Sequence, residues 1–94
     1  MERFEWSDAK NLQLKQERGI SFEEIVFVIE HGGLVDVVPH SNLEKYPNQL
    51  VYVINVNDYI YLVPFVKNDT GARFLKTIIP SRKATKRYWG ENKP

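Results

Sequence analysis

The sequence lacks the residues and patterns on which many kinds of site depend. It contains no cysteine, which excludes disulfides and thiolate metal sites. It has no glycine-rich phosphate loop, no H-x-x-x-H motif and no Ser-His-Asp pattern, and the spacing of its histidines and carboxylates does not indicate a metal site. We therefore expect neither a metal ion nor a cofactor.

Long apolar runs are absent as well. The longest, YIYLVPFV at 59–66, is far too short to span a bilayer. The opening residues, MERFEWSDAK, lack the basic and then apolar segments of a signal peptide. These absences predict a cytoplasmic protein with no membrane partner, and the length of 94 residues predicts a single domain over 1–94.

Acidic residues are missing from one part of the chain. Residues 73–87 include six Lys or Arg side chains and no Asp or Glu. Residues 1–66 contain five basic and ten acidic residues, a net charge of −5, whereas residues 67–94 contain eight and two, a net charge of +6; the sum is +1. This asymmetry predicts a basic face that meets an anion, a nucleic acid or an acidic partner, and the alternative is a solvated basic tail.

Two helices are predicted in the first third of the chain. The first runs from a cap at Ser7 or Asp8 to Gly19, and its thin apolar stripe indicates a helix on the surface of something larger. The expected stripe consists of Ala9, Leu12 and Gln16. The second, SFEEIVFVIEHGG at 21–33, has a capping box formed by Ser21 and Glu24 and a clear apolar stripe.

Four β-rich runs follow these helices, at 34–38, 49–56, 59–66 and 73–79. Asn57-Asp58 indicates a tight hairpin between the second and third runs. Pro64 cannot donate a ladder hydrogen bond, so its strand is predicted to be an edge strand or to be bulged there. The predicted fold class is α+β: two N-terminal helices packed on a roughly four-stranded antiparallel sheet, then a short basic C-terminal helix after Ser81.

The C-terminal basic segment is the first candidate binding site. Arg82 and Lys86 are i,i+4 neighbours in the predicted helix, as are Lys83 and Arg87, and an anion would relieve the repulsion within each pair. The following rings, Tyr88 and Trp89, suit stacking on unpaired bases, but both could instead anchor the helix to the core, and that is the expected role of Trp89. In the preceding strand, Arg73 and Lys76 are expected to point to opposite faces of the sheet.

Two other places carry chemistry-bearing side chains. His40 follows a strand end, with Lys45 nearby, and histidine is the side chain best suited to move protons near neutral pH. A loop histidine with no function is the alternative. Lys10 and Arg18 lie about two turns apart on the first helix, and Lys10 has the alternative role of pairing with an adjacent acid.

Four segments together resemble a known family. They are FEWSDAK at 4–10, RGISFEE at 18–24, PHSNLEK at 39–45 and IIPSRKATKRY at 78–88. In this order they resemble the BrnT toxins of bacterial type II toxin–antitoxin systems, which are small RelE-like ribonucleases. The family's usual His before the Gly-Val-Ser step is Arg18 here, and an Asn of its first helix is Leu14.

The resemblance implies metal-independent cleavage of messenger RNA. Arg82 would stabilise the phosphorane, His40 or a lysine such as Lys10 would be the base, and Tyr88 would be the acid. The implied RNA contacts are Arg18, Lys45, Arg73, Lys76, Lys83, Lys86 and Arg87. The implied partner is a ribbon-helix-helix antitoxin whose acidic segment covers the basic helix, so that DNA is bound only through the antitoxin complex. The alternative function is a non-catalytic nucleic-acid-binding or adaptor domain of the same fold.

Overall fold

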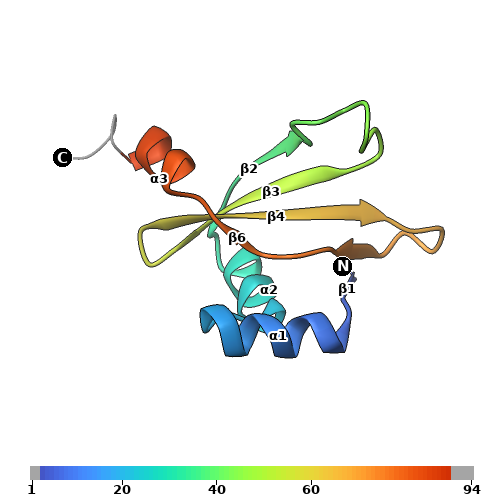
Figure 1. Ribbon diagram of the computed structural model, residues 1–94, viewed down its shortest axis with the longest axis horizontal. Coiled ribbons are helices and arrows are strands. Elements are labelled where there is room, and N and C mark those ends of the chain that lie inside the picture. The colour runs from blue at the N-terminus through green and yellow to red at the C-terminus, as the bar shows by residue number, and fades with distance from the viewer. Residues whose placement is uncertain (1–2, 90–94) are drawn as a thin grey trace.

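The computed structural model describes residues 3–89, and of Trp89 only the backbone. The chain has the predicted α+β architecture, and residues 3–89 form three helices and one mixed sheet (Figure 1). The elements in chain order are β1 (Phe4–Glu5), α1 (Asp8–Arg18), α2 (Phe22–Glu30), β2 (Leu34–Pro39), β3 (Leu50–Val56), β4 (Tyr59–Lys67), β5 (Arg73–Leu75), β6 (Ile79–Pro80) and α3 (Arg82–Trp89). No helix within residues 3–89 is both long and apolar enough to cross a membrane.

The sheet has the strand order β1-β5-β4-β3-β2, and β6 also pairs with β4. The four strands β2 to β5 are antiparallel, as predicted, whereas β1 is an additional strand that runs parallel to β5. The hairpin between β3 and β4 turns at Asn57 and Asp58, whose φ angles of 52° and 67° lie in the left-handed region. Asn and Asp are the non-glycine residues that adopt this conformation most readily, which explains the turn without a glycine.

The single strand predicted at 73–79 is wrong, because the structure contains two short strands there, β5 and β6. Both pair with β4, β5 at Phe65 to Lys67 and β6 at Tyr61 and Leu62. Pro64 lies between these two pairings, and its carbonyl accepts the Lys76 N–H at 2.8 Å. A strand residue directs its N–H and C=O to the same side, so the proline's missing donor faces the interruption in the neighbouring strand.

Helix α1 begins and ends as predicted but buries a different face. The Ser7 hydroxyl accepts the Lys10 N–H, and Gly19 ends the helix with a φ of 65°. The expected stripe is wrong, since Leu12 is 57% exposed, while Leu14 and the polar Asn11 are buried. Asn11 is buried because its amide joins α1 to α2: Oδ1 accepts the Phe22 N–H at 2.8 Å, and Nδ2 donates to Glu23 at 2.7 Å.

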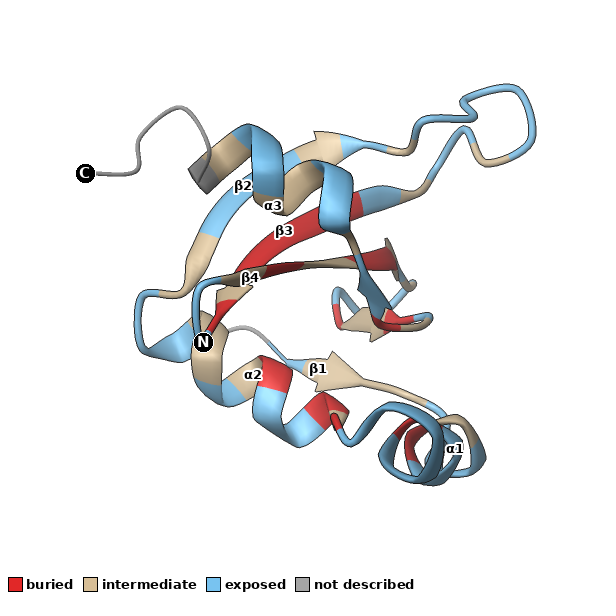
Figure 2. Cartoon of the chain, turned by 60° about the vertical axis from the view of Figure 1, so that its left-hand side comes forward, coloured by how far each residue is buried: buried red, intermediate tan, exposed pale blue. Residues whose placement is uncertain are grey.

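The two faces of the sheet differ. On the first, which we call the core face, α1 and α2 pack on alternate strand residues, and Tyr52, Ile54 and Val63 are buried against Phe22 and Ile25. On the second, which we call the α3 face, Val53 and Ile60 are also buried, and α3 lies at this side (Figures 1 and 2). The sheet therefore separates α3 from the two N-terminal helices.

Candidate functional site

Helix α3 is attached to the start of β4 by a compact set of hydrogen bonds. The Ser81 hydroxyl accepts the Ala84 N–H at 3.0 Å, which confirms Ser81 as the cap. The Ser81 N–H donates to the Ile60 carbonyl at 3.0 Å, and the Ile60 N–H donates to the Thr85 hydroxyl at 2.8 Å. The helix therefore has a defined position on the α3 face.

The side of α3 that faces away from the sheet is basic. Ala84, Thr85 and Tyr88 are half-buried on the other side. Four side chains are exposed and form what we call the α3 cation cluster: Arg82, Lys83, Lys86 and Arg87. None of the four makes an ion pair with any residue in the part of the chain that the structure describes. Their charges are thus available to an external anion.

A carboxylate lies beside the last turn of α3. The Tyr88 hydroxyl donates to Asp36 Oδ2 at 3.4 Å, and Asp36 Oδ1 accepts the Val37 N–H at 2.8 Å. Asp36 is exposed, and a register shift between Leu34 and Asp36 interrupts the pairing of β2 with β3. The sequence-based prediction did not include Asp36. Its signal is an acid within a β-branched run, since Asp is depleted in strands and irregular strands occur often beside active sites.

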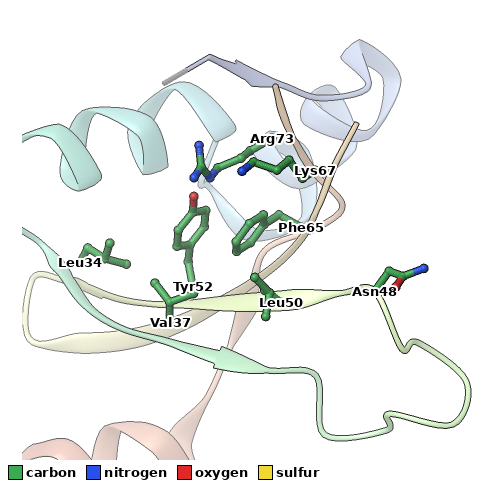
Figure 3. A pocket seen from close by; sticks show the side chains of 8 residues that line it. All are labelled: Leu34, Val37, Asn48, Leu50, Tyr52, Phe65, Lys67 and Arg73. Carbon is green, nitrogen blue, oxygen red and sulfur yellow. The ribbon is translucent and has the colours of Figure 1, made fainter. Parts of the chain in front are cut away.

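Lys76 and Arg73 lie on opposite faces of the sheet, as predicted. Phe74 pairs with Val66 on the α3 face, and the Lys76 ammonium lies 5.6 Å from the centre of the Phe74 ring. Arg73 points to the core face, where it lies near Tyr52 (Figure 3). Of these two predicted RNA contacts, only Lys76 shares a face with the α3 cation cluster.

His40 lies just after β2 in a loop with its own internal contacts. Its Nδ1 accepts the Asn42 N–H at 3.0 Å, and its ring lies 4.5 Å from that of Tyr46. The Lys45 ammonium lies 5.4 Å from the same Tyr46 ring. With Nδ1 as an acceptor, the neutral ring carries its proton on Nε2 and has no second lone pair for a substrate hydroxyl. His40 is therefore not poised as a general base in this conformation.

The two basic residues predicted on the first helix are separated from α3 by the sheet. Lys10 and Arg18 belong to α1, on the core-face side (Figures 1 and 2). Arg18 Nη1 donates to the Ile78 carbonyl at 2.7 Å, so this guanidinium joins the helix end to the segment between β5 and β6. The structure thus brings together Arg82, Lys83, Lys86, Arg87 and Tyr88 on one element, and it does not bring Lys10, Arg18 or Arg73 to them.

Within residues 3–89, no group of three or more His, Asp, Glu or Cys side chains is arranged to hold a metal ion. The expected role of the Trp89 side chain, anchoring α3 or stacking on a base, lies outside the described residues. The α3 cation cluster, with Lys76, Asp36 and Tyr88, is the group of polar side chains that best fits a polyanion.

Comparison with known proteins finds no protein-family model that matches the chain, no curated protein and no solved structure. The resemblance to the BrnT family therefore rests on the four sequence segments, and the function is argued from the site itself.

Proposed function

We propose that the protein is a metal-independent endoribonuclease, the toxin of a type II toxin–antitoxin pair, which acts on messenger RNA in the cytoplasm. The observation that carries this proposal is the α3 cation cluster, exposed and without internal ion pairs among the described residues, beside the contact between Tyr88 and Asp36. Clustered cations attract phosphates. Strand cleavage also needs a base and an acid close together, and Asp36 and Tyr88 can supply them.

The proposed reaction is transesterification within the RNA strand. A base removes the proton of a ribose 2′-hydroxyl, and the 2′-oxygen forms a bond to the adjacent phosphorus. The bond from phosphorus to the 5′-oxygen breaks, and that oxygen takes a proton from an acid. The products are a 2′,3′-cyclic phosphate and a 5′-hydroxyl end, so neither water nor a cofactor is consumed.

The side chains of the α3 face are assigned roles by their chemistry. Arg82 stabilises the phosphorane, because its planar guanidinium donates to two oxygens at once. The carboxylate of Asp36 is the proton acceptor, since His40 Nδ1 is already bonded to the Asn42 N–H. Tyr88, whose hydroxyl contacts Asp36, is the acid that gives a proton to the leaving 5′-oxygen. Lys76, Lys83, Lys86 and Arg87 bind neighbouring phosphates.

The proposed inhibitor is an acidic antitoxin segment that covers the α3 cation cluster. Its carboxylates would offset the repulsion among the four cations and block RNA at the same time. We expect the antitoxin to be of the ribbon-helix-helix type, with DNA bound only by the complex. Association should be faster at low salt, because complementary charge accelerates the encounter.

The test is induced expression of the wild type beside two variants. The wild type should stop growth and leave RNA fragments that end in 2′,3′-cyclic phosphates. Arg82→Ala should reduce cleavage about ten- to a hundredfold, as expected for the loss of one charge-assisted hydrogen bond of roughly 1.5–3 kcal/mol. The control is Lys67→Ala on the opposite face of the sheet, which should cleave like the wild type. Intact transcripts and normal growth during expression of the wild type would refute the proposal that the protein is a ribonuclease.

A second candidate function is binding of RNA without cleavage. The lack of a histidine base favours it: Arg18 stands where the family has His and donates to the Ile78 carbonyl, and His40 Nδ1 already accepts the Asn42 N–H. This function predicts salt-dependent RNA binding by the α3 cation cluster and no cyclic phosphate ends at any protein concentration.

A further inference from the structure

A hollow on the core face is left uncovered by α1 and α2. It has a volume of about 240 Å³, and Tyr52 and Phe65 line it with stacked rings whose centres lie 4.0 Å apart (Figure 3). Leu34, Val37 and Leu50 complete its apolar wall, and Val37 and Leu50 are each 43% exposed. Exposed apolar side chains next to a concave apolar surface are typical of sites that bind a partner.

Two cations stand at one rim of this hollow. Lys67 and Arg73 are paired in the register between β4 and β5, so their side chains project from the same face, next to Phe65 and Tyr52 (Figure 3). Among residues 3–89, none of the side chains that line the hollow belongs to an Asp or Glu. An apolar wall with positive charge at one rim is complementary to an apolar group that carries a carboxylate nearby.

The size of the hollow decides which class of ligand fits. Pockets for small molecules and cofactors typically enclose about 300–1,000 Å³, so this hollow is below that range. It matches a pocket for one anchor side chain at the centre of a protein interface. The cations are on β4 and β5 and part of the apolar wall is on β2, roughly 10–15 Å apart at strand spacing, so the ligand must extend across several strands.

We propose that this hollow, the Arg73 pocket, binds an acidic segment of a partner protein, which inserts one large apolar side chain beside Leu50 and Phe65 and places a carboxylate near Lys67 and Arg73. The site lies on the face opposite the α3 cation cluster, so it is a second interaction surface. It does not depend on the proposed ribonuclease activity.

The test uses the full chain and a set of fluorescent twelve-residue peptides rich in Glu, each with one Leu, Ile, Phe or Trp near its centre. At least one should bind with saturable anisotropy, and replacing its apolar residue by Ala should weaken binding tenfold or more. NMR of ¹⁵N-labelled protein should show shifts at residues lining the Arg73 pocket. Leu50→Ala and Lys67→Glu should each weaken binding about tenfold, whereas Lys83→Glu, the same charge change on α3, should change it less than twofold.

Three results would overturn the proposal. One is that no peptide of the set binds better than its alanine version. Another is equal weakening by Lys67→Glu and Lys83→Glu, which would assign binding to overall charge. The third is a dimer in sedimentation that Lys67→Glu dissociates, because the pocket would then belong to an interface between two copies. Loss of RNA cleavage would leave the proposal standing, so its failure and that of the ribonuclease are distinguishable.

Discussion

The hydroxyl of Thr85 accepts a hydrogen bond from the backbone N–H of Ile60 at 2.8 Å and donates one to the Ser81 carbonyl at 2.7 Å. This side chain therefore links the middle of α3 both to β4 and to the residue that caps the helix. The position of every cation on α3 depends on this attachment.

Thr85→Val should loosen α3 and lower the free energy of unfolding by about 1–3 kcal/mol, because the Ile60 N–H loses its acceptor in a half-buried place. Urea denaturation followed by fluorescence measures the change. Thr85→Ser keeps the hydroxyl and should recover most of the stability. Thr77→Val, an equivalent change at a position between β5 and β6, should stay within about 0.5 kcal/mol of the wild type.

Asn11→Ala should destabilise the junction of α1 and α2 by about 1–3 kcal/mol, since the buried Phe22 N–H would be left without an acceptor. Thermal and urea unfolding both report this loss. Gln13→Ala on the same helix is the matched control: its bond to Glu17 is exposed, and its removal should have little effect. Equal losses for the two variants would contradict the structural role of Asn11.

The pKa of the Glu23 carboxyl is lowered, first by the hydrogen bond from Asn11 and then by its own backbone N–H; desolvation opposes these effects, and Lys15 and Ser21 add smaller lowering effects. A carboxyl with a lowered folded-state pKa stabilises the fold above its ordinary pKa of about 4.5 and loses that contribution as the pH falls through the folded-state value.

Glu23→Gln should therefore flatten the acid limb of a plot of melting temperature against pH, with the difference from the wild type shrinking below pH 4.5. Asn11→Ala should flatten the same limb, because it removes the largest cause of the shift. Glu24→Gln, in the same first turn of α2, serves as the control for removal of a surface charge. If melting temperature depends on pH in Glu23→Gln as steeply as in the wild type, this carboxyl does not contribute to the pH dependence of stability.

Asp36→Asn should abolish most RNA cleavage while leaving RNA affinity unchanged or slightly higher, because the substitution removes the proton acceptor together with a negative charge beside the cations. Loss of a general base typically costs about 10²–10⁴-fold in rate. Tyr88→Phe should show the same separation of cleavage from binding. Asp69→Asn, in the turn between β4 and β5, controls for net charge, and cleavage by Asp36→Asn at the wild-type rate would remove Asp36 from the mechanism.

RNA binding should weaken steeply with salt, and removing one phosphate-binding side chain from α3 should reduce the slope of log K against log salt by about 0.7 for single strands. Lys86→Ala and Lys83→Ala should each show this reduction, and the double variant should show about twice as much. Lys67→Ala lies on the core face and should leave the slope unchanged. Equal reductions of this slope in all three single variants would mean that RNA does not bind preferentially to the α3 face.

Local signals predicted several elements correctly. The Ser7, Ser21 and Ser81 caps, the glycine that ends α1 and the Asn57-Asp58 turn depend on backbone geometry within a few residues, which sequence specifies directly. The alternation of side chains also placed Arg73 and Lys76 on opposite faces.

Features that depend on distant contacts were not predictable in this way. Hydrophobicity favoured Leu12 for the buried face of α1, but the buried residues are Leu14 and the polar Asn11, whose hydrogen-bond partners lie on α2. Strand β1 has two residues and no periodic signal, and it exists because β5 offers a parallel edge. Asp36 stands out in the sequence only as an acid within a β-branched run, and its place beside α3 follows from the fold, which brings Tyr88 to it.

The pairing of Phe4 with Arg73 and the hydrogen bond from Arg18 to Ile78 both join the first elements of the chain to its last third. Neither contact can form on the ribosome until the residues of that last third have emerged. The contacts of β1 and α1 with these residues therefore form only after the residues have been synthesised. Contacts so distant in sequence slow folding, because a long loop must close before they form. The nascent chain thus completes these contacts only after the late residues are made, and the hydrogen bond between Ile60 and Thr85 likewise needs residue 85.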